Sequence, residues 1–351
     1  MEPDLILKKL EELTPHERLG KQMREFFGRN LDYAEFVYLV RHPSCTDLDH
    51  LRRGAALREQ ETIRNGFLKY RDGGLTEDDF FPKGEDVVVE KLLHYIDIPA
   101  HKHDFLECAY VISGTCLHRI NGNDYIQEAG SFVYIPSGTT HVLFPVEESS
   151  CLTTKVRSSA FLKMNFPEIF DFLYPIAFHC GDDPVVLQAV LQILHQQEQK
   201  KAYHGRISFH LFQTMLLYIL QNYQSTASVM TLRARRDSQL LKLLNYTASN
   251  YQTVTLGELA EKFHYNMTYL SRMFREETGQ SFSSMLKEYK LRKAAELLLN
   301  SKLQLEVICQ DVGYQDVTQF IRSFKKQYGV TPGQYRQRSV AVKDLSTSPN
   351  N

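Results

Sequence analysis

Residues 255–336 read TLGELAEKFHYNMTYLSRMFREETGQSFSSMLKEYKLRKAAELLLNSKLQLEVICQDVGYQDVTQFIRSFKKQYGVTPGQYR. The stretch contains two segments that resemble each other in sequence. At an offset of forty-nine, Leu259-Ala260-x-x-Phe263-x-Tyr265 lies over Ile308-Cys309-x-x-Val312-Gly313-Tyr314. At an offset of fifty, Leu270-x-Arg272-x-Phe274-Arg275 lies over Phe320-x-Arg322-x-Phe324-Lys325. Self-similarity at a fixed period indicates that one supersecondary unit has been duplicated.

Each copy of the unit is predicted to hold two short amphipathic helices joined by a tight turn. In the first copy, Thr255 and Glu258 fit the S/T-x-x-E capping box, which satisfies the free amides at a helix start. Leu270 and Phe274 stand four residues apart on the inward face of the second helix. The second copy has the same plan, although Gln304 is a poorer cap than Thr255. Polar and basic side chains on the outer side of the second helix suit a helix-turn-helix that reads the major groove.

A helix without Gly or Pro is predicted between the copies, over residues 281–300, after the second helix of the first copy at 267–278. At 1.5 Å per residue the connecting helix is roughly 28 Å long. One turn of duplex DNA is about 34 Å. A rigid spacer of this length is therefore suited to holding two readers near successive major grooves.

The stretch resembles the DNA-binding domain of the AraC/XylS family of transcriptional regulators. The matching residues are Lys290-Leu291-x-x-Ala294-x-x-x-Leu298, Val312-Gly313-Tyr314-x-Asp316, Phe320-x-x-x-Phe324-Lys325-Lys326 and Gly329-Val330-Thr331-Pro332-x-x-Tyr335-Arg336. The resemblance implies sequence-specific binding to double-stranded DNA by a bipartite seven-helix unit, with RNA polymerase as a further partner. The first copy has His264 where the second has Gly313, so its turn is expected to be strained or differently shaped.

Carried over by position, the resemblance gives two groups of residues that contact DNA. The expected base readers are Thr268, Ser271, Arg272, Thr318, Ile321 and Arg322, and phosphate contacts are assigned to Arg275, Lys325 and Lys326. Either arginine among the base readers can make the bidentate contact to guanine O6 and N7. Paired helices with basic faces also occur in protein-interaction bundles. The duplication and the Gly-x-Thr-Pro ending favour DNA over that alternative.

Composition and charge indicate two or three domains with different partners. The chain has 351 residues, of which 24% are charged and 43% apolar, enough for more than one core. Its net charge of −1 hides an asymmetry, because residues 231–340 hold 17 Lys/Arg against 10 Asp/Glu and the remainder is acidic. A basic domain joined to an acidic one is typical of a DNA-binding protein whose other half has another role.

Cysteine usage and hydropathy indicate a cytoplasmic protein without membrane contact. The six cysteines occur singly, without CxxC or zinc-finger spacing, so reduced thiols are expected. The amino-terminal residues are acidic and charged rather than a signal peptide. No apolar run approaches about 18 residues, so no membrane span is expected.

Residues 1–80 are expected to form a helical extension that is not a standard part of the AraC pattern. Two segments have mixed charge and look helical: LILKKLEELTPHERLGKQMREFF at 5–27 and LDHLRRGAALREQETIRNGFLKY at 48–70. Packing and oligomer contacts are the roles that these segments themselves suggest.

Residues 81–165 have short runs rich in Val, Ile and Tyr, separated by turn signals such as Asn121-Gly122. Many short strands with Gly and Pro turns predict a small β-barrel or sandwich. The details resemble a cupin. His101-x-His103-x-x-x-Glu107 with Gly114 matches the first cupin motif, and Gly130-(x)5-Pro136-x-Gly138-x-x-His141 matches the second. Tyr95 stands where the first motif has Gly, and Pro145 where the second has Asn.

The cupin resemblance places four polar side chains inside the barrel: His101, His103, Glu107 and His141. Alternate strand residues share a face, so the first two imidazoles can approach one ion. The set would suit Mn, Fe, Ni or Zn. The alternative, favoured because barrels of this family are usually small-molecule receptors, is a pocket without metal. In either case the barrel mouth is the expected effector site, with Tyr110 and Tyr134 as further candidates for stacking on a sugar.

Residues 166–223 are expected to return to helix. Asp183-Pro184 is a cap followed by a first-turn proline, and the helical pair resembles the dimerisation region of the family. Packing against the barrel is an equally good interpretation. Residues 224–236 are polar and are interpreted as a linker to the DNA-binding domain at 237–338, and residues 339–351 as a disordered tail.

The sequence therefore predicts an α+β chain: a cupin-like β-barrel with flanking helices, then an all-α double helix-turn-helix domain. The leading hypothesis is a regulator of transcription, an activator rather than a repressor, that responds to a small molecule. The family resemblance makes that effector a saccharide. A metal-dependent cupin enzyme tethered to DNA, such as a dioxygenase or isomerase, is the alternative motivated by the four polar residues. A third hypothesis is a ligand-independent regulator controlled by partner proteins through residues 1–80.

Overall fold

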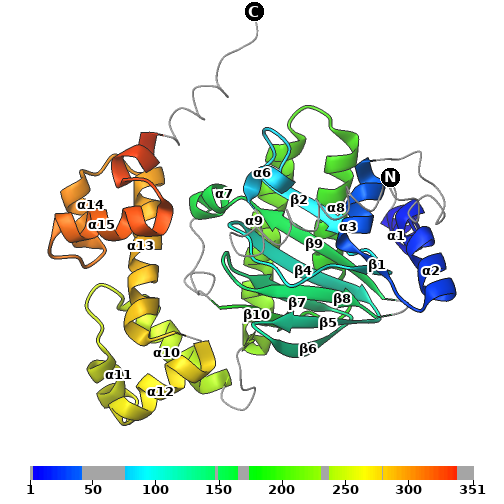
Figure 1. Ribbon diagram of the computed structural model, residues 1–351. Coiled ribbons are helices and arrows are strands. Elements are labelled where there is room, and N and C mark those ends of the chain that lie inside the picture. Colours follow the sequence, from blue (N-terminus) through cyan, green and yellow to red (C-terminus); the bar gives the residue numbers. More distant parts are fainter. Residues whose placement is uncertain are drawn as a thin grey trace, which may run out of the picture. The chain divides into compact units, whose positions relative to one another are not determined.

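The computed structural model describes residues 3–41, 76–146, 149–164, 174–230, 237–278 and 280–337 (Figure 1). The chain divides into two compact units. The first comprises Met1–Arg157 and Pro175–Met230, and the second comprises Ser158–Tyr174 and Thr231–Asn351. Four stretches for which the sequence gives a prediction lie outside the described residues: the helix expected at 48–70, residues 166–173 of the range expected to be helical, residues 231–236 of the linker, and the tail at 339–351.

The first unit contains two antiparallel sheets, which confirms the expected barrel-like β-domain. The larger sheet has the strand order β11-β10-β7-β4-β9-β2, and the smaller has the order β6-β5-β8. The strands are β2 (Val87–Lys91), β4 (Leu106–Ser113), β5 (Thr115–Ile120), β6 (Asn123–Glu128), β7 (Ser131–Ile135), β8 (His141–Pro145), β9 (Ser150–Val156), β10 (Ile176–His179) and β11 (Ser228–Val229). Asn121 and Gly122 form the predicted hairpin turn between β5 and β6, both at positive φ.

The interior of the β-domain is built from alternate residues of facing strands. Buried side chains from both sheets meet there, including Ala109, Val133, Cys116, Leu143 and Cys151. Because successive strand residues point to opposite faces, the intervening residues of the larger sheet face away from this core.

Two long helices pack against the larger sheet, α8 (Pro184–Gln199) and α9 (His204–Tyr223) (Figure 1). Asp183 caps α8 by accepting a hydrogen bond from the Val185 amide at 2.7 Å, as its sequence predicts. Further along α8, the Gln197 side chain accepts from the Val89 amide at 2.8 Å and donates to the Val89 carbonyl at 3.1 Å. β2 is the last strand of its sheet, so Gln197 satisfies backbone groups that no further strand pairs.

Two strands of the larger sheet lie where none was expected, as does the two-residue β1 (Leu31–Asp32) within the extension expected to be helical. β10 falls in the range 166–223 that was assigned to helix, and β11 falls in the stretch interpreted as linker. β10 pairs with β7 and with β11 and buries Ile176 and Phe178. A four-residue strand is too short to give a clear period in the sequence, and its pairing partners are distant in the chain.

The amino-terminal extension folds against the start of the first cupin motif. It contains α1 (Pro3–Glu11), α2 (Pro15–Phe27), β1 (Leu31–Asp32) and α3 (Tyr33–Arg41), and the short α6 (Glu77–Phe80) follows later in the chain. β1 pairs in parallel with β3 (Ile96–Asp97). The extension is thus part of the first unit, joined to it by main-chain hydrogen bonds.

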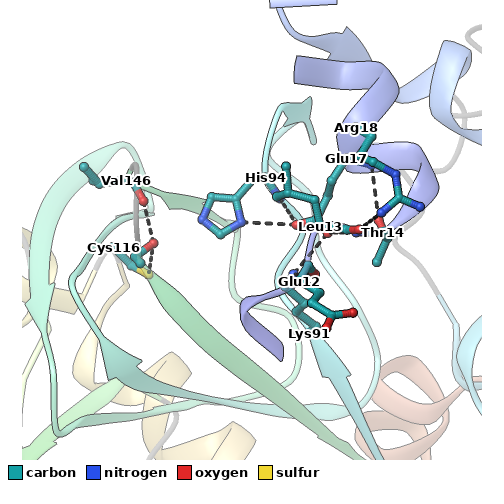
Figure 2. A network of polar contacts seen from close by, with 10 residues as sticks. Glu12, Leu13, Thr14, Glu17, Arg18, Lys91, His94, Cys116 and Val146 are labelled. Carbon is teal, nitrogen blue, oxygen red and sulfur yellow. Dashed lines mark hydrogen bonds and ion pairs between the residues drawn. The ribbon is translucent and has the colours of Figure 1, made fainter. Parts of the chain in front are cut away.

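A buried carboxylate fastens α2 to the β-domain, as Figure 2 shows. The Glu17 side chain has no exposed surface. It accepts hydrogen bonds from the Thr14 amide at 2.8 Å, the Lys91 ammonium at 3.1 Å, and the backbone amide and Nδ1 of His94 at 2.9 and 3.2 Å. Four donors around one carboxylate are enough to compensate for its removal from water.

The departure from the cupin motif at Tyr95 is accommodated by the same helix. Tyr95 has a φ of 61°, the left-handed conformation that glycine adopts most easily. Gly20 of α2 lies against it, because a Cβ at Gly20 would be 2.7 Å from the Tyr95 oxygen and 2.8 Å from its Cβ. Beyond the helix, the Leu31 amide donates to the same Tyr95 oxygen at 3.0 Å. Tyr95 thus adopts the left-handed backbone conformation expected of a glycine, and α2 of the extension packs against it.

The second unit contains the helices expected for the DNA-binding domain. They are α10 (Asp237–Ser249), α11 (Leu256–Lys262), α12 (Met267–Thr278), α13 (Phe282–Asn300), α14 (Leu305–Asp311) and α15 (Val317–Tyr328). The unit also includes α7 (Ser158–Lys163), a helix in the range 81–165 that was expected to belong to the barrel. The connecting helix α13 runs between the two helix-turn-helix copies (Figure 1), and Ser281 caps it through the Ser284 amide. Among the described residues, no helix is both long and apolar enough to cross a membrane.

Candidate DNA-binding surface and barrel site

The reading helix of the first copy, α12, presents its outer side as predicted. Asn266 starts it by accepting a hydrogen bond from the Thr268 amide at 2.8 Å. Leu270, Met273 and Phe274 are buried beneath the helix. Of the predicted contact residues, Thr268, Arg272 and Arg275 are exposed and Ser271 is half-buried. Arg272 has 65% of its side chain exposed and lies 3.7 Å from Glu276, a surface pair that a phosphate or a guanine can readily displace.

The reading helix of the second copy, α15, has the same plan with one difference. Asp316 caps it through the Gln319 amide at 2.6 Å, and Phe320 and Phe324 are buried. The predicted contact residues Thr318, Arg322, Lys325 and Lys326 are exposed. Ile321 is half-buried against the apolar core of this copy, so part of its side chain serves packing.

The two turns have one shape despite their different residues. His264 has a φ of 57° and Gly313 a φ of 75°. The amide that follows each donates to the corresponding carbonyl, Tyr265 to Ala260 at 2.8 Å and Tyr314 to Cys309 at 2.9 Å. The turn at His264 is therefore not differently shaped. It holds a histidine in the left-handed region, which costs about 1 kcal/mol for a residue with a Cβ.

The helix starts of the two copies differ as their sequences predict. Thr255 caps α11 by accepting from the Glu258 amide at 3.1 Å, whereas Gln304 makes no side-chain cap at α14. The Glu258 carboxylate, expected to complete a capping box, accepts a hydrogen bond from the Tyr246 hydroxyl at 2.7 Å. It thereby ties α11 to α10.

In the first unit, three of the four predicted polar residues come together. His103, Glu107 and His141 each offer a ligand atom within 4.8 Å of the others, and all three are buried. His101 pairs with His141 through two main-chain hydrogen bonds of 2.9 and 3.0 Å, and their rings lie 5.0 Å apart. The two cupin motifs also meet directly, because the Gly138 amide donates to the His103 carbonyl at 2.8 Å.

Two of the imidazoles have a defined tautomer. Nδ1 of His103 lies 2.7 Å from the Phe105 carbonyl, and Nδ1 of His101 lies 3.1 Å from the Pro99 carbonyl. A carbonyl oxygen only accepts, so each Nδ1 carries the proton and each Nε2 keeps its lone pair. Nε2 of His103 is buried, 3.6 Å from Glu107, and has no hydrogen-bond partner among the described residues. A backbone carbonyl on the far nitrogen is the usual support of a metal-binding histidine.

Burial disfavours the charged forms of these groups. It lowers the pKa of His103 to about 3, with the neighbouring His101 acting in the same direction, and it lowers the pKa of His141 well below the ordinary value. Burial also raises the pKa of Glu107. At neutral pH the imidazoles are thus neutral and their lone pairs are free to bind a cation or a hydroxyl group.

Two further residues of the barrel interior were missed by the sequence analysis. His118 of β5 lies with its ring 5.4 Å from that of His141, and its Nδ1 is 2.7 Å from the Gln127 side chain. Nε2 of His118 and Oε1 of Gln127 are buried without a partner among the described residues. The alternation in TCLHRI places His118 on the face of the buried Cys116, and this was the available signal.

Tyr110 and Tyr134 do not line the site, contrary to expectation. Tyr110 stands three residues after Glu107 on β4, so its side chain points to the opposite face. Tyr134 pairs with Cys108 in the strand register, on that same outer face. Both tyrosines are buried, and burial raises the pKa of Tyr110 to about 12. They belong to the layer between the sheet and the helices.

Comparisons with known proteins match both units. Family models identify a helix-turn-helix domain at residues 259–338 and a cupin domain at residues 94–151. The HTH-type transcriptional activator RhaS of Escherichia coli O139:H28 is 28% identical over 270 residues, which cover 74% of this chain and 95% of RhaS.

Among solved structures, the C-terminal domain of the two-component response regulator yesN from Fusobacterium nucleatum is 36% identical, with a TM-score of 0.28. It matches 28% of this chain and 99% of that domain. The C-terminal domain of AraT, a response regulator from Geobacillus stearothermophilus, is 36% identical with a TM-score of 0.29, over 30% of this chain and 88% of that one.

A duplicated helix-turn-helix with two exposed basic helices, joined to a cupin domain, defines a DNA-binding regulator of transcription. Its helix-turn-helix domain is of the AraC type, and together with the cupin domain it makes the chain similar to the activator RhaS. RhaS is a transcriptional activator, which agrees with the expectation from sequence that this chain is a regulator and not an enzyme.

Proposed function

We propose that this regulator activates transcription from the cytoplasm and reads DNA with both α12 and α15. Support comes from the exposed side chains at matching positions of the two helices, Arg272 and Arg322 above all. In this proposal the base readers are Thr268, Ser271, Arg272, Thr318, Ile321 and Arg322, while Arg275, Lys325 and Lys326 contact phosphates. RNA polymerase is the further partner that activation requires.

Binding-site selection from random DNA with the full chain tests whether both helix-turn-helix copies contact DNA, which is called the two-headed reading below. Two blocks about ten base pairs apart are expected, since that is one turn of the duplex. Selection of a single block would contradict it. A repeated pair of blocks would indicate a dimer, for which the exposed Leu217 of α9 is a contact candidate.

We further propose that the barrel interior receives a small polar effector, a saccharide by class. The observation behind this is the group of buried polar atoms without partners on one interior surface, contributed by His103, His118, Gln127 and His141. Sugar hydroxyls both donate and accept hydrogen bonds, so they match a surface that mixes lone pairs and N–H groups. A thermal-shift screen of sugars against wild type and His118→Ala tests this, since a true effector should stabilise only the wild type.

The same residues also fit a divalent transition metal. Nε2 of His103, a carboxylate oxygen of Glu107 and a ring nitrogen of His141 would hold it, with His101 beside them. Such an ion would supply a Lewis-acidic contact for an effector hydroxyl. Elemental analysis after gentle purification separates the two forms of the site. Stoichiometric Mn, Fe, Ni or Zn that disappears in His103→Ala supports the metal, and an equal metal content in both proteins opposes it.

A further inference from the structure

Lys290 of the connecting helix α13 joins the two helix-turn-helix copies. Its ammonium donates one hydrogen bond to the Gln252 carbonyl at 3.0 Å and another to the Gly313 carbonyl at 3.1 Å. Gln252 lies between α10 and α11, beside the first copy, and Gly313 is the turn residue between α14 and α15 of the second. One side chain thus bridges a main-chain carbonyl beside the first copy and a main-chain carbonyl within the second. Each copy, with the loop that precedes it, is called a reading head below.

The two segments approach each other closely at this bridge. A Cβ added at Gly313 would lie 2.2 Å from the Gln252 oxygen and 2.8 Å from its Cα. Gly313 therefore serves two purposes, because its φ of 75° also shapes the turn. Next to it, the rings of Tyr251 and Tyr289 lie 5.2 Å apart. The second head is in direct main-chain contact with a loop of the first.

The chemistry of the bridge favours a fixed geometry. Gln252 and Gly313 lie in the turns that follow α10 and α14, so their carbonyl oxygens belong to no helical hydrogen-bond ladder and accept from Lys290 instead. Hydrogen bonds from a charged donor are stronger than neutral ones. Lys290 is half-buried, and burial lowers its pKa, so water competes less for the two carbonyls than it would at an exposed site.

We propose that Lys290 is a positioning residue that sets the spacing between the two reading helices and thereby the spacing of the two DNA blocks. Gly313 lies in the turn that leads into α15, so fixing it against Gln252 fixes α15 relative to the first head. The inference rests on the proposed two-headed reading. Lys290 itself is assigned no contact with DNA.

The test compares the full-length wild type with Lys290→Met on duplexes selected by the wild type. Three duplexes are used: the selected spacing, the same blocks one base pair further apart, and a single block. Lys290→Met should bind the selected duplex about tenfold more weakly, which is about 1.4 kcal/mol. Its penalty for the inserted base pair should shrink by a similar factor, while its affinity for a single block stays at the wild-type level.

Two more variants sharpen the result. Lys290→Arg keeps a charged double donor and should restore most of the spacing preference. Lys287→Met removes the same charge from an exposed position of the same helix, so it should leave the inserted-base-pair penalty unchanged. A loss shared equally by Lys287→Met and Lys290→Met, or an unaltered spacing penalty in Lys290→Met, overturns the proposal.

Folding and function are separated by two controls. If circular dichroism shows that Lys290→Met is not folded at the assay temperature, the comparison is made with Lys290→Gln, which must show a reduced penalty for the proposal to stand. If the wild type selects only one block, the two-headed reading fails, and the positioning role of Lys290 fails with it. If the wild type selects two blocks and the variants keep its spacing preference, the role of Lys290 alone is wrong.

Discussion

Replacing Glu17 with glutamine should loosen the amino-terminal extension by a measurable amount. Burial alone would raise the pKa of Glu17, but hydrogen bonds from His94, Thr14 and Lys91 outweigh it and lower the pKa to about 2, from an ordinary value of 4.5. Each pKa unit corresponds to about 1.4 kcal/mol of preference for the charged form. The carboxylate therefore contributes about 3 kcal/mol to docking of the extension at neutral pH.

The contribution has a defined pH dependence. A carboxyl whose pKa is lowered by folding stabilises the folded state above its unfolded value, and this stability is lost as the pH falls through the folded value. For Glu17 the loss begins near pH 4.5 and continues toward pH 2. At pH 3 less than half of the neutral-pH contribution should remain.

Hydrogen–deuterium exchange of α2 (Pro15–Phe27) is the appropriate assay, because it reports local opening without requiring the whole chain to unfold in two states. Glu17→Gln keeps the shape and loses the charge, so α2 amides should exchange roughly 30- to 150-fold faster at pH 7, or about 2–3 kcal/mol. Glu25→Gln is the matched control, since Glu25 is exposed on the same helix, and it should change exchange by less than about 0.5 kcal/mol.

Two outcomes would refute the reasoning about Glu17. The first is equal exchange in Glu17→Gln and Glu25→Gln at pH 7, which would mean that the buried carboxylate does not hold the helix. The second is a difference between wild type and Glu17→Gln that stays constant down to pH 3, which would assign the effect to packing rather than to charge.

Three further variants test separate parts of the molecule. Gly20→Ala places a Cβ 2.7 Å from the Tyr95 oxygen, so it should destabilise the docked extension by about 1–3 kcal/mol. The measurement is hydrogen–deuterium exchange of the α2 amides, and unchanged protection would show that the contact is not tight. Arg322→Ala should cost about 1–3 kcal/mol in DNA binding and relax preference at one base pair, and an unaltered mobility-shift titration would count against its role. His103→Ala should reduce any copurifying metal to background without altering DNA affinity measured in the absence of effector, and metal retained at full stoichiometry would place the ion elsewhere.

The DNA-binding unit could be predicted closely because its signals are local. The period of Leu270 and Phe274, the caps at Thr255 and Ser281, and the positive φ at Gly313 all depend on residues within one or two turns. The bridge from Lys290 could not be predicted in this way. It depends on which two carbonyls the folded helices bring within reach of one ammonium, and no periodicity reports that distance.

The barrel site shows the same division between local and tertiary information. Cupin motif spacing located His103, Glu107 and His141, but it could not locate His118, which lies outside both motifs and reaches the site through the pairing of β5 with β8. Tyr110 was placed in the site on residue type alone. Counting its position along the strand from Glu107 would have put it on the opposite face.

The extension and the altered cupin motif are best understood as one adaptation. Taken alone, residues before the barrel look like an appended segment, and Tyr95 in place of glycine looks like a defect. The structure joins them: Gly20 provides the space for Tyr95, the Leu31 amide binds its carbonyl, and Glu17 fastens the adjacent His94. Without the extension, the strained Tyr95 would lose its covering helix, and Lys91 and His94 would lose their buried carboxylate. In this chain the extension therefore packs around the left-handed residue that stands where the first cupin motif has glycine.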